Sequence, residues 1–75
     1  MNEERRNKLR NARSQLITIQ HEIESVKETE DEVRDNMPEN LQCSQRYEES
    51  EECSEAMEEA ISAIEDAIES IGEAI

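Results

Sequence analysis

The chain has 75 residues with 21 acidic and 8 basic side chains, which gives a formal net charge of −13. Its length allows one small domain, residues 1–75, and its single tyrosine, without phenylalanine or tryptophan, requires an aliphatic core. The negative charge disfavours direct binding to nucleic acid or an anionic membrane and favours basic proteins as partners. A plainer interpretation is that the acidic surface only keeps a small helical protein soluble.

A stripe of apolar residues before Pro38 predicts the first helix. Its members alternate in steps of three and four, so they repeat every 3.5 residues, as coiled-coil helices require. We expect this helix over about residues 3–36, because Glu3 and Glu4 suit the positive end of a helix dipole and Pro38 stops the helix from continuing. The large apolar residues of the stripe are Leu9, Leu16, Ile19, Ile23, Val26 and Val33.

A turn over about residues 37–43 leads to a second predicted helix over about residues 44–74, with Ser44 as its N-cap. The apolar stripe of this helix contains Met57, Ile61, Ile64, Ile68 and Ile71. Small residues repeat every seven positions beside the stripe, at Cys53, Ala60, Ala67 and Ala74. They make the apolar surface wider than one partner helix covers, which is typical of a helix bundle.

These patterns predict an all-α fold, an antiparallel two-helix coiled-coil hairpin that dimerises into a four-helix bundle. The core of one hairpin is small. About a dozen large apolar side chains, at roughly 2 kcal/mol each, fall short of an ordering cost of about 1.5 kcal/mol per residue. Association with a second copy is the expected remedy, and we therefore predict a homodimer.

The charges beside the two stripes support antiparallel pairing. The flanking positions of the first helix are Arg13, Gln20, Lys27 and Arg34, and those of the second are Glu51, Glu58, Glu65 and Gly72. Basic residues therefore meet acidic residues wherever both are charged. With the turn centred near residue 40, Val26 is predicted to face Ser54, and Glu30 to face Ser50. These two polar layers would specify register at a cost in stability.

Two charged surfaces are candidate binding sites. The first is an acidic face of the second helix, predicted to contact a protein partner through Glu48, Glu49, Glu51, Glu52, Glu55, Glu58 and Glu59. The second is a basic cluster that would suit phosphates, formed by Arg5, Arg6, Lys8, Arg10 and Arg13. The favoured alternative for the cluster is structural, in which it neutralises Glu65, Asp66, Glu69 and Glu73 on the second helix.

No pattern in the chain indicates catalysis, a metal or a cofactor. There is no nucleophile–base arrangement and no glycine-rich phosphate loop, so we expect a protein that is not an enzyme and has no cofactor. Cys43 and Cys53 would lie about 15 Å apart along one helix, too far for a disulfide, and are predicted to be reduced packing residues. His21 is predicted to be an ordinary surface residue.

Two absences in the sequence concern location. No stretch approaches the roughly 18 consecutive apolar residues that a membrane-spanning helix needs. The N-terminus is charged and lacks the apolar segment of a signal peptide. We therefore expect a cytoplasmic protein without membrane contacts.

The turn carries a family resemblance. The segment DNMPENLQ, residues 35–42, is followed by Ser44, by the segment RYE at residues 46–48 and then by Ala-Ile-Glu repeats. This order resembles small acidic helical-hairpin proteins of Firmicutes phages, prophages and mobile elements. The resemblance covers residues from about 28 to the end. It implies action in the cytoplasm of a host bacterium, and by analogy the binding of a host protein, such as a component of CRISPR or another defence system.

Three functional hypotheses follow from the sequence. The leading one is a non-enzymatic inhibitor or regulator that binds a host protein, such as one that handles nucleic acid, through the acidic face. The second is a structural oligomerisation module without a host target. The third is sequestration of a nucleotide signal at the basic cluster, although no aromatic residue lies nearby to stack on a base.

Overall fold

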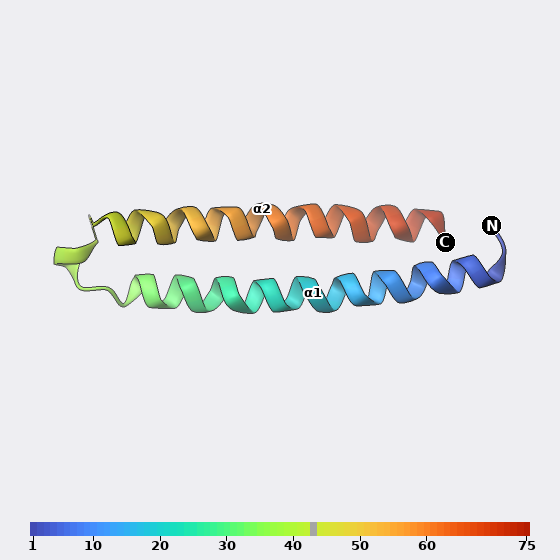
Figure 1. The fold of residues 1–75 in the computed structure, drawn as a ribbon, viewed down its shortest axis with the longest axis horizontal. Helices are drawn as coiled ribbons and strands as arrows, with labels where there is room; N and C mark the ends of the chain where they lie inside the picture. The colour runs from blue at the N-terminus through green and yellow to red at the C-terminus, as the bar shows by residue number, and fades with distance from the viewer. Residues whose placement is uncertain (43) are drawn as a thin grey trace.

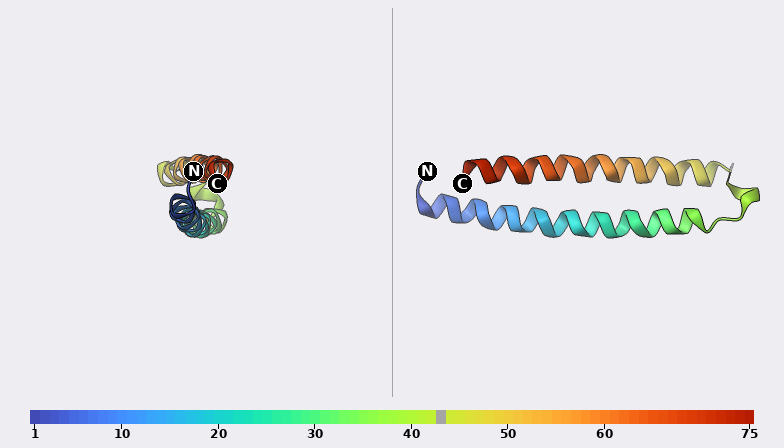
Figure 2. Two further views of the ribbon diagram at one scale, coloured as in Figure 1. Left: turned by 90° about the vertical axis from the view of Figure 1, so that its right-hand side faces the viewer. Right: turned by 180° about the vertical axis from the view of Figure 1, so that it is seen from behind.

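The structure is a computed structural model that describes residues 1–42 and 44–75. Two long helices, α1 (Glu3–Asp35) and α2 (Gln45–Ala74), lie side by side and run in opposite directions (Figure 1). The molecule is a rod of 60 × 14 × 12 Å, with both termini at one end, the open end, and the turn at the other (Figure 2). The predicted all-helical hairpin is thus confirmed. The expectation for Cys43 falls outside the described residues.

Each helix begins at a polar cap that satisfies a free backbone N–H. The side chain of Asn2 accepts a hydrogen bond of 2.9 Å from the backbone nitrogen of Arg5, and the hydroxyl of Ser44 accepts one of 3.3 Å from that of Tyr47. Both cap residues are extended, as is usual for an N-cap. Ser44 therefore caps α2 as predicted, and both helices lie within one residue of their predicted bounds.

Pro38 separates the two helices. It has an extended backbone, with φ −57° and ψ 146°, and its ring removes the donor that a continuing helix would need. A short 3₁₀ helix, η1 (Glu39–Leu41), follows it directly. The backbone nitrogen of Leu41 donates to the carbonyl of Pro38 at 2.9 Å, and that of Ser44 donates to the carbonyl of Leu41 at 3.0 Å. These bonds turn the chain back toward α1.

The apolar stripe of α2 faces α1 along the rod. Ile61, at its centre, is the only apolar side chain of the described residues that is buried, with 6% of its surface exposed. The neighbouring residues are half-buried, because two helices alone cannot enclose them. These are Leu9, Leu16 and Ile23 on α1, and Met57, Ile64, Ile68 and Ile71 on α2.

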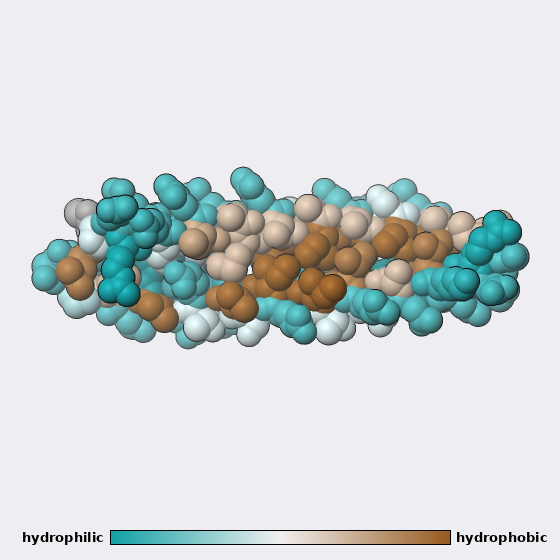
Figure 3. All heavy atoms as spheres, in the orientation of Figure 1, coloured by the Kyte–Doolittle hydropathy of each residue, from teal (hydrophilic) through white to brown (hydrophobic). Residues whose placement is uncertain are grey.

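Three residues predicted for the core are not in the hairpin's interface. Ile19, Val26 and Val33 are exposed by 44%, 59% and 55%, so their assignment to the hairpin core is wrong; as core of an oligomer they remain a prediction. The helix α1 turns its flanking positions toward α2 instead, because Lys27 and Arg34 bond across the interface. Figure 3 shows a hydrophobic band along both helices on the face that is turned to the viewer.

The predicted pairing of layers near the turn is also wrong. Ser54 bonds to Asp31 rather than facing Val26, and Ser50 bonds to Arg34 rather than facing Glu30. Side chains lean toward the N-terminus of their own helix, so in an antiparallel pair they meet at higher residue numbers than their backbones do. The structure therefore has one polar layer, in which Asp31 and Arg34 bond to Ser50 and Ser54, in place of the two predicted layers.

Candidate functional site

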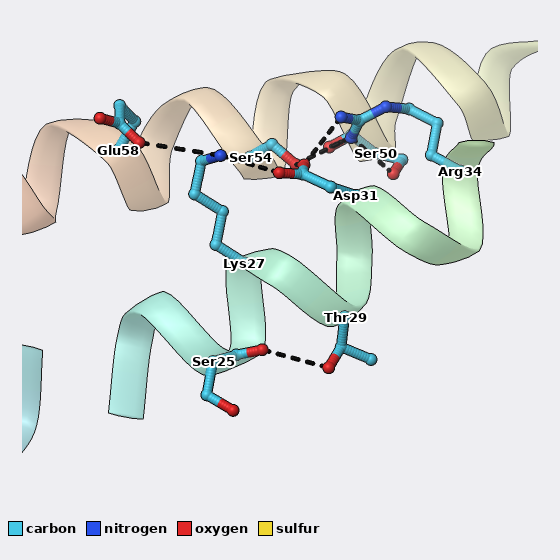
Figure 4. Close-up of polar contacts among 8 residues, drawn as sticks. All are labelled: Ser25, Lys27, Thr29, Asp31, Arg34, Ser50, Ser54 and Glu58. Atoms are coloured by element: carbon cyan, nitrogen blue, oxygen red, sulfur yellow. Dashed lines mark hydrogen bonds and ion pairs between the residues drawn. The ribbon is translucent and has the colours of Figure 1, made fainter. Parts of the chain in front are cut away.

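The largest polar network between the helices lies near the turn. We call it the polar layer, and it consists of Lys27, Asp31, Arg34, Ser50 and Ser54 (Figure 4). The three charged residues follow at spacings of four and three, which places them on one face of α1. Ser50 and Ser54 are one turn apart on α2 and are only 6% and 5% exposed. Half-buried polar groups of α1 thus meet buried polar groups of α2 at the same level, where each group needs a partner.

Arg34 and Asp31 connect the two helices within this layer. The Nη1 of Arg34 donates to the carbonyl of Ser50 at 3.1 Å, and to the hydroxyls of Ser50 and Ser54 at 3.2 and 2.8 Å. The Nη2 of Arg34 and the hydroxyl of Ser54 both donate to Oδ1 of Asp31, at 2.8 and 2.7 Å. Lys27 donates to Oδ2 of Asp31 at 2.8 Å and lies 3.7 Å from Glu58.

The network keeps Asp31 ionised. Hydrogen bonds from Lys27, Ser54 and Arg34, in that order of importance, hold the pKa of Asp31 well below its ordinary value. In return the carboxylate raises the pKa of Lys27 and of Arg34, mainly by accepting their hydrogen bonds. A carboxylate with a lowered pKa is a poor proton acceptor near neutral pH, so it does not activate the hydroxyl of Ser54. The polar layer is an arrangement for joining helices.

The lowered pKa of Asp31 predicts a loss of stability in acid. The unfolded carboxyl has a pKa near 3.8 and the folded one a lower value, so the stabilisation is complete above about pH 4 and is lost as the pH falls toward the folded pKa. We expect Asp31→Asn to melt below the parent at pH 7, and the gap between their melting temperatures to shrink below pH 3.8. Circular dichroism melts between pH 7 and pH 2 measure this gap.

Asp35→Asn is the matched control for this titration. Asp35 is an exposed carboxylate of α1 and accepts none of the hydrogen bonds that join the described helices. Its variant should stay close to the parent at every pH. A gap between parent and Asp31→Asn that does not change with pH would show that the ionisation of Asp31 does not stabilise the fold.

The predicted acidic face lies along the outside of α2. All seven of its glutamates are exposed. Glu49 points away from the others, since its position on the helical wheel lies on the side of the small residues, and it accepts a hydrogen bond of 2.9 Å from Gln45. The remaining six share one side of α2 and form what we call the acidic ridge: Glu48, Glu51, Glu52, Glu55, Glu58 and Glu59.

The acidic ridge continues beyond the residues that the sequence singled out. Glu65, Asp66, Glu69 and Glu73 lie on the same side of α2 and carry it to the open end. Glu58 lies 3.7 Å from Lys27, and Glu65 accepts a hydrogen bond of 3.0 Å from Gln20. These two contacts join predicted flanking positions of the two helices. They involve carboxylates at the inner margin of the ridge and leave its outer margin free to meet a partner.

A groove between the helices adds carboxylates that the sequence reasoning did not assign. Its lining contains Ile61, Lys27 and Asp31. The rest of the lining is acidic and consists of Glu24, Glu28, Glu32 and Asp35 from α1, with Glu58 and Glu65 from α2. Glu24, Glu28 and Glu32 are four residues apart, which places them on one face of α1. This spacing could have predicted from the sequence that α1 also carries an acidic face. The acidic surface therefore spans both helices.

The basic cluster at the open end engages its own helix. Arg10 lies 2.8 Å from Glu3, Arg6 lies 3.7 Å from Glu3, and Lys8 lies 3.8 Å from Glu4. The ion pairs of residues 1–42 and 44–75 include none between this cluster and Glu65, Asp66, Glu69 or Glu73. The structural alternative, neutralisation of the second helix, is thus not seen as a direct ion pair and stays a prediction, and Arg13 is the member of the cluster that lies against α2, beside Gly72. The cause is proximity, since Glu3 and Glu4 lie one or two turns from the basic residues on α1.

Two further expectations concern metals and membranes. Within the described part of the chain, no group of three or more His, Cys, Asp or Glu side chains is placed to hold a metal ion. No described helix combines the length and the apolar character needed to cross a bilayer. Cys53 is a free thiol on the surface of α2, and His21 is exposed on α1.

Comparison with protein-family models, curated proteins and solved structures gave no match for the chain.

Proposed function

We propose that the chain is a non-enzymatic binding protein that captures a basic protein of a host bacterium through the acidic ridge. The observation that carries this proposal is the continuity of the ridge along the outer side of α2, with carboxylates exposed to solvent. A surface of this kind attracts basic partners and accelerates their encounter. We place the action in the host cytoplasm, with a dimer as the working unit.

The charge spacing of the ridge supports a partner that handles nucleic acid. Glu48 and Glu59 are eleven residues apart, so six carboxylates lie along about 17 Å of helix at the usual rise per residue. This density is about one negative charge per 3 Å, close to the one per 3.4 Å along a single strand of duplex DNA. A protein surface built to hold phosphates would therefore meet carboxylates at a similar spacing. Inhibition of a defence protein would follow from occupying that surface.

Charge reversal on the ridge tests the proposal. We expect the combined variant Glu52→Lys, Glu55→Lys and Glu59→Lys to retain at least tenfold less of the partner than the parent, because three attractive contacts become repulsive. The measurement is an affinity pull-down of tagged protein from a Firmicutes lysate at low and high salt, with bound proteins identified by mass spectrometry. Added duplex DNA should release the partner if the ridge occupies a phosphate-binding surface.

The matched control makes three charge reversals of the same kind on the same side of α2, but nearer the open end. Asp66→Lys, Glu69→Lys and Glu73→Lys alter the extension of the ridge near the open end, and this variant should retain most of the partner. Equal loss from both variants would indicate unspecific charge attraction. Unchanged binding after reversal of Glu52, Glu55 and Glu59 would exclude the ridge as the contact surface. Circular dichroism of both variants checks that they remain helical.

A second candidate function is a structural module that binds only copies of itself. The exposure of Ile19, Val26 and Val33 favours this alternative, since a covered surface explains such a row better than an open one. It predicts a tight oligomer that retains no specific protein from lysate at any salt concentration. The pull-down described above therefore distinguishes the two functions.

A further inference from the structure

One side of the hairpin is apolar at its centre and carries few charges. We call it the neutral face; it is centred on Ile19, Val26 and Val33 of α1 and on Ala60 and Ala67 of α2. The three residues of α1 follow one another at intervals of seven and are all strongly exposed.

The flanks of the neutral face include three carboxylates, Glu22 and Glu30 on α1 and Glu49 on α2. The uncharged residues around them are Gln15, Thr18, Ser25 and Thr29 on α1, and Ala56, Ala63 and Ser70 on α2. Charged residues make up 39% of the chain, so their depletion along one side is a property of that side. Depletion of charge at the centre of a patch is the compositional mark of a protein interface. Small residues on α2 would also let a neighbouring helix approach closely.

The net charge is divided very unequally along the rod. Residues 20–64, which form the half of the rod nearer the turn, contain 15 acidic and 3 basic residues, a net charge of −12. The remaining residues contain 6 acidic and 5 basic residues, a net charge of −1. The difference in net charge is largest within residues 1–35, which comprise α1 and the two residues before it. Residues 1–19 have a net charge of +3 from five basic and two acidic groups, and residues 20–35 one of −5 from two basic and seven acidic groups.

We propose that the neutral face binds a second copy of the chain in the antiparallel orientation, with the two turns at opposite ends of the bundle. In this orientation α1 packs on α1 and α2 on α2, because the two-fold axis lies in the interface and crosses the helices. The basic residues 1–19 of each copy then lie beside the acidic residues 20–35 of the other. This assignment concerns a different surface from the acidic ridge and does not depend on its partner.

The parallel orientation is disfavoured by the same charges. It would place two halves of charge −12 side by side, and packed helices lie only about 8–10 Å apart. That separation is comparable to the Debye length of about 8 Å at physiological salt, so the repulsion would be only partly screened. The antiparallel orientation separates these halves. It also brings Ile19 of each copy to the two-fold axis, where the two side chains cover one another.

Disulfide cross-linking tests the orientation. In the antiparallel dimer, residues 12 and 26 of neighbouring α1 helices lie at the same level, since both are seven positions from Ile19 at the two-fold axis. We would introduce Ala12→Cys and Val26→Cys together with Cys43→Ser and Cys53→Ser, and oxidise the native dimer. We expect a covalent dimer whose proteolytic peptides link residue 12 to residue 26. Within one chain these residues are about 21 Å apart along the helix, too far to be bridged.

The control for cross-linking is Val26→Cys with Cys43→Ser and Cys53→Ser, which leaves one thiol in each chain. It should give no covalent dimer, because the two copies of residue 26 lie about 21 Å apart along the axis in the antiparallel arrangement. Links between two copies of residue 12, or between two copies of residue 26, would overturn the proposed orientation. Absence of any covalent dimer from the variant with two introduced thiols would overturn the proposed contact between the α1 helices.

A second measurement tests the neutral face itself. Val26→Glu places a charge in the proposed interface, twice per dimer, and should weaken dimerisation by about 100-fold or more in sedimentation equilibrium. Ile17→Glu makes a similar change on another side of α1, where Ile17 is 38% exposed, and should leave the dimer intact. Equal dimerisation of both variants would overturn the proposal, as would a parent chain that stays monomeric at millimolar concentration.

Discussion

Replacing Ile61 with alanine should cost about 2–4 kcal/mol of the free energy of unfolding and abolish most of the helix content near 37 °C. Ile61 is the only buried apolar side chain of the described residues, and deleting a buried isoleucine to alanine typically costs this much. A protein with so small a core has little reserve against such a loss. Urea titrations followed by circular dichroism, at one fixed protein concentration, measure the change.

Ile17→Ala is the matched control, because it removes the same atoms from a side chain that is 38% exposed. Its effect should stay within about 0.5 kcal/mol, and alanine's higher helix propensity offsets part of the lost contact. Equal losses at both positions would mean that Ile61 does not form the centre of the interface.

The polar layer should respond in opposite directions to partial and complete replacement. Arg34→Leu alone removes the donor to Ser50, Ser54 and Asp31, leaves Asp31 with only the hydrogen bonds from Lys27 and Ser54, and should lower the melting temperature more than any other single change in the layer. The combined variant Asp31→Leu, Arg34→Leu and Ser54→Ala removes most of these polar groups together. It should melt at or above the parent, since apolar residues often replace a buried charged network without loss.

The combined variant should gain stability at the expense of a unique structure. Polar layers specify register, and a continuous apolar seam allows helices to slide and to form larger assemblies. Its sedimentation profile should therefore broaden, and its amide NMR spectrum should show more than one set of signals. A combined variant that is less stable than Arg34→Leu alone would show that the network itself stabilises the fold.

The two proposed surfaces together describe one assembly. The acidic ridge lies on the outer side of α2, and the neutral face lies on a different side of the same helix. An antiparallel dimer through the neutral face pairs the two α2 helices and places both ridges along one edge of the bundle, in opposite directions. A basic partner would then meet two antiparallel rows of carboxylates. Such a surface raises the effective local concentration of binding groups without any new contact.

Much of the fold is predictable from the sequence, because it depends on local rules. The apolar period of 3.5 residues, the cap at Ser44 and the break at Pro38 each depend on residues that are close together along the chain. They predict two long helices and an antiparallel hairpin, which the structure has. The acidic side of α2 is likewise a matter of spacing on one helix. Only Glu49 departs from it, since its position lies outside the arc of the other six.

The tertiary structure decided which side of α1 faces its partner. The stripe containing Ile19, Val26 and Val33 has the right period, but a period does not say how far a helix rotates about its own axis. Long side chains settle that rotation here, since Lys27 and Arg34 reach across to α2 and turn the valines outward. The pairing of Asp31 with Ser54 and the acidic groove have the same origin. They depend on contacts between residues that are far apart in the chain. The energies of these contacts cannot be inferred from sequence patterns within one helix.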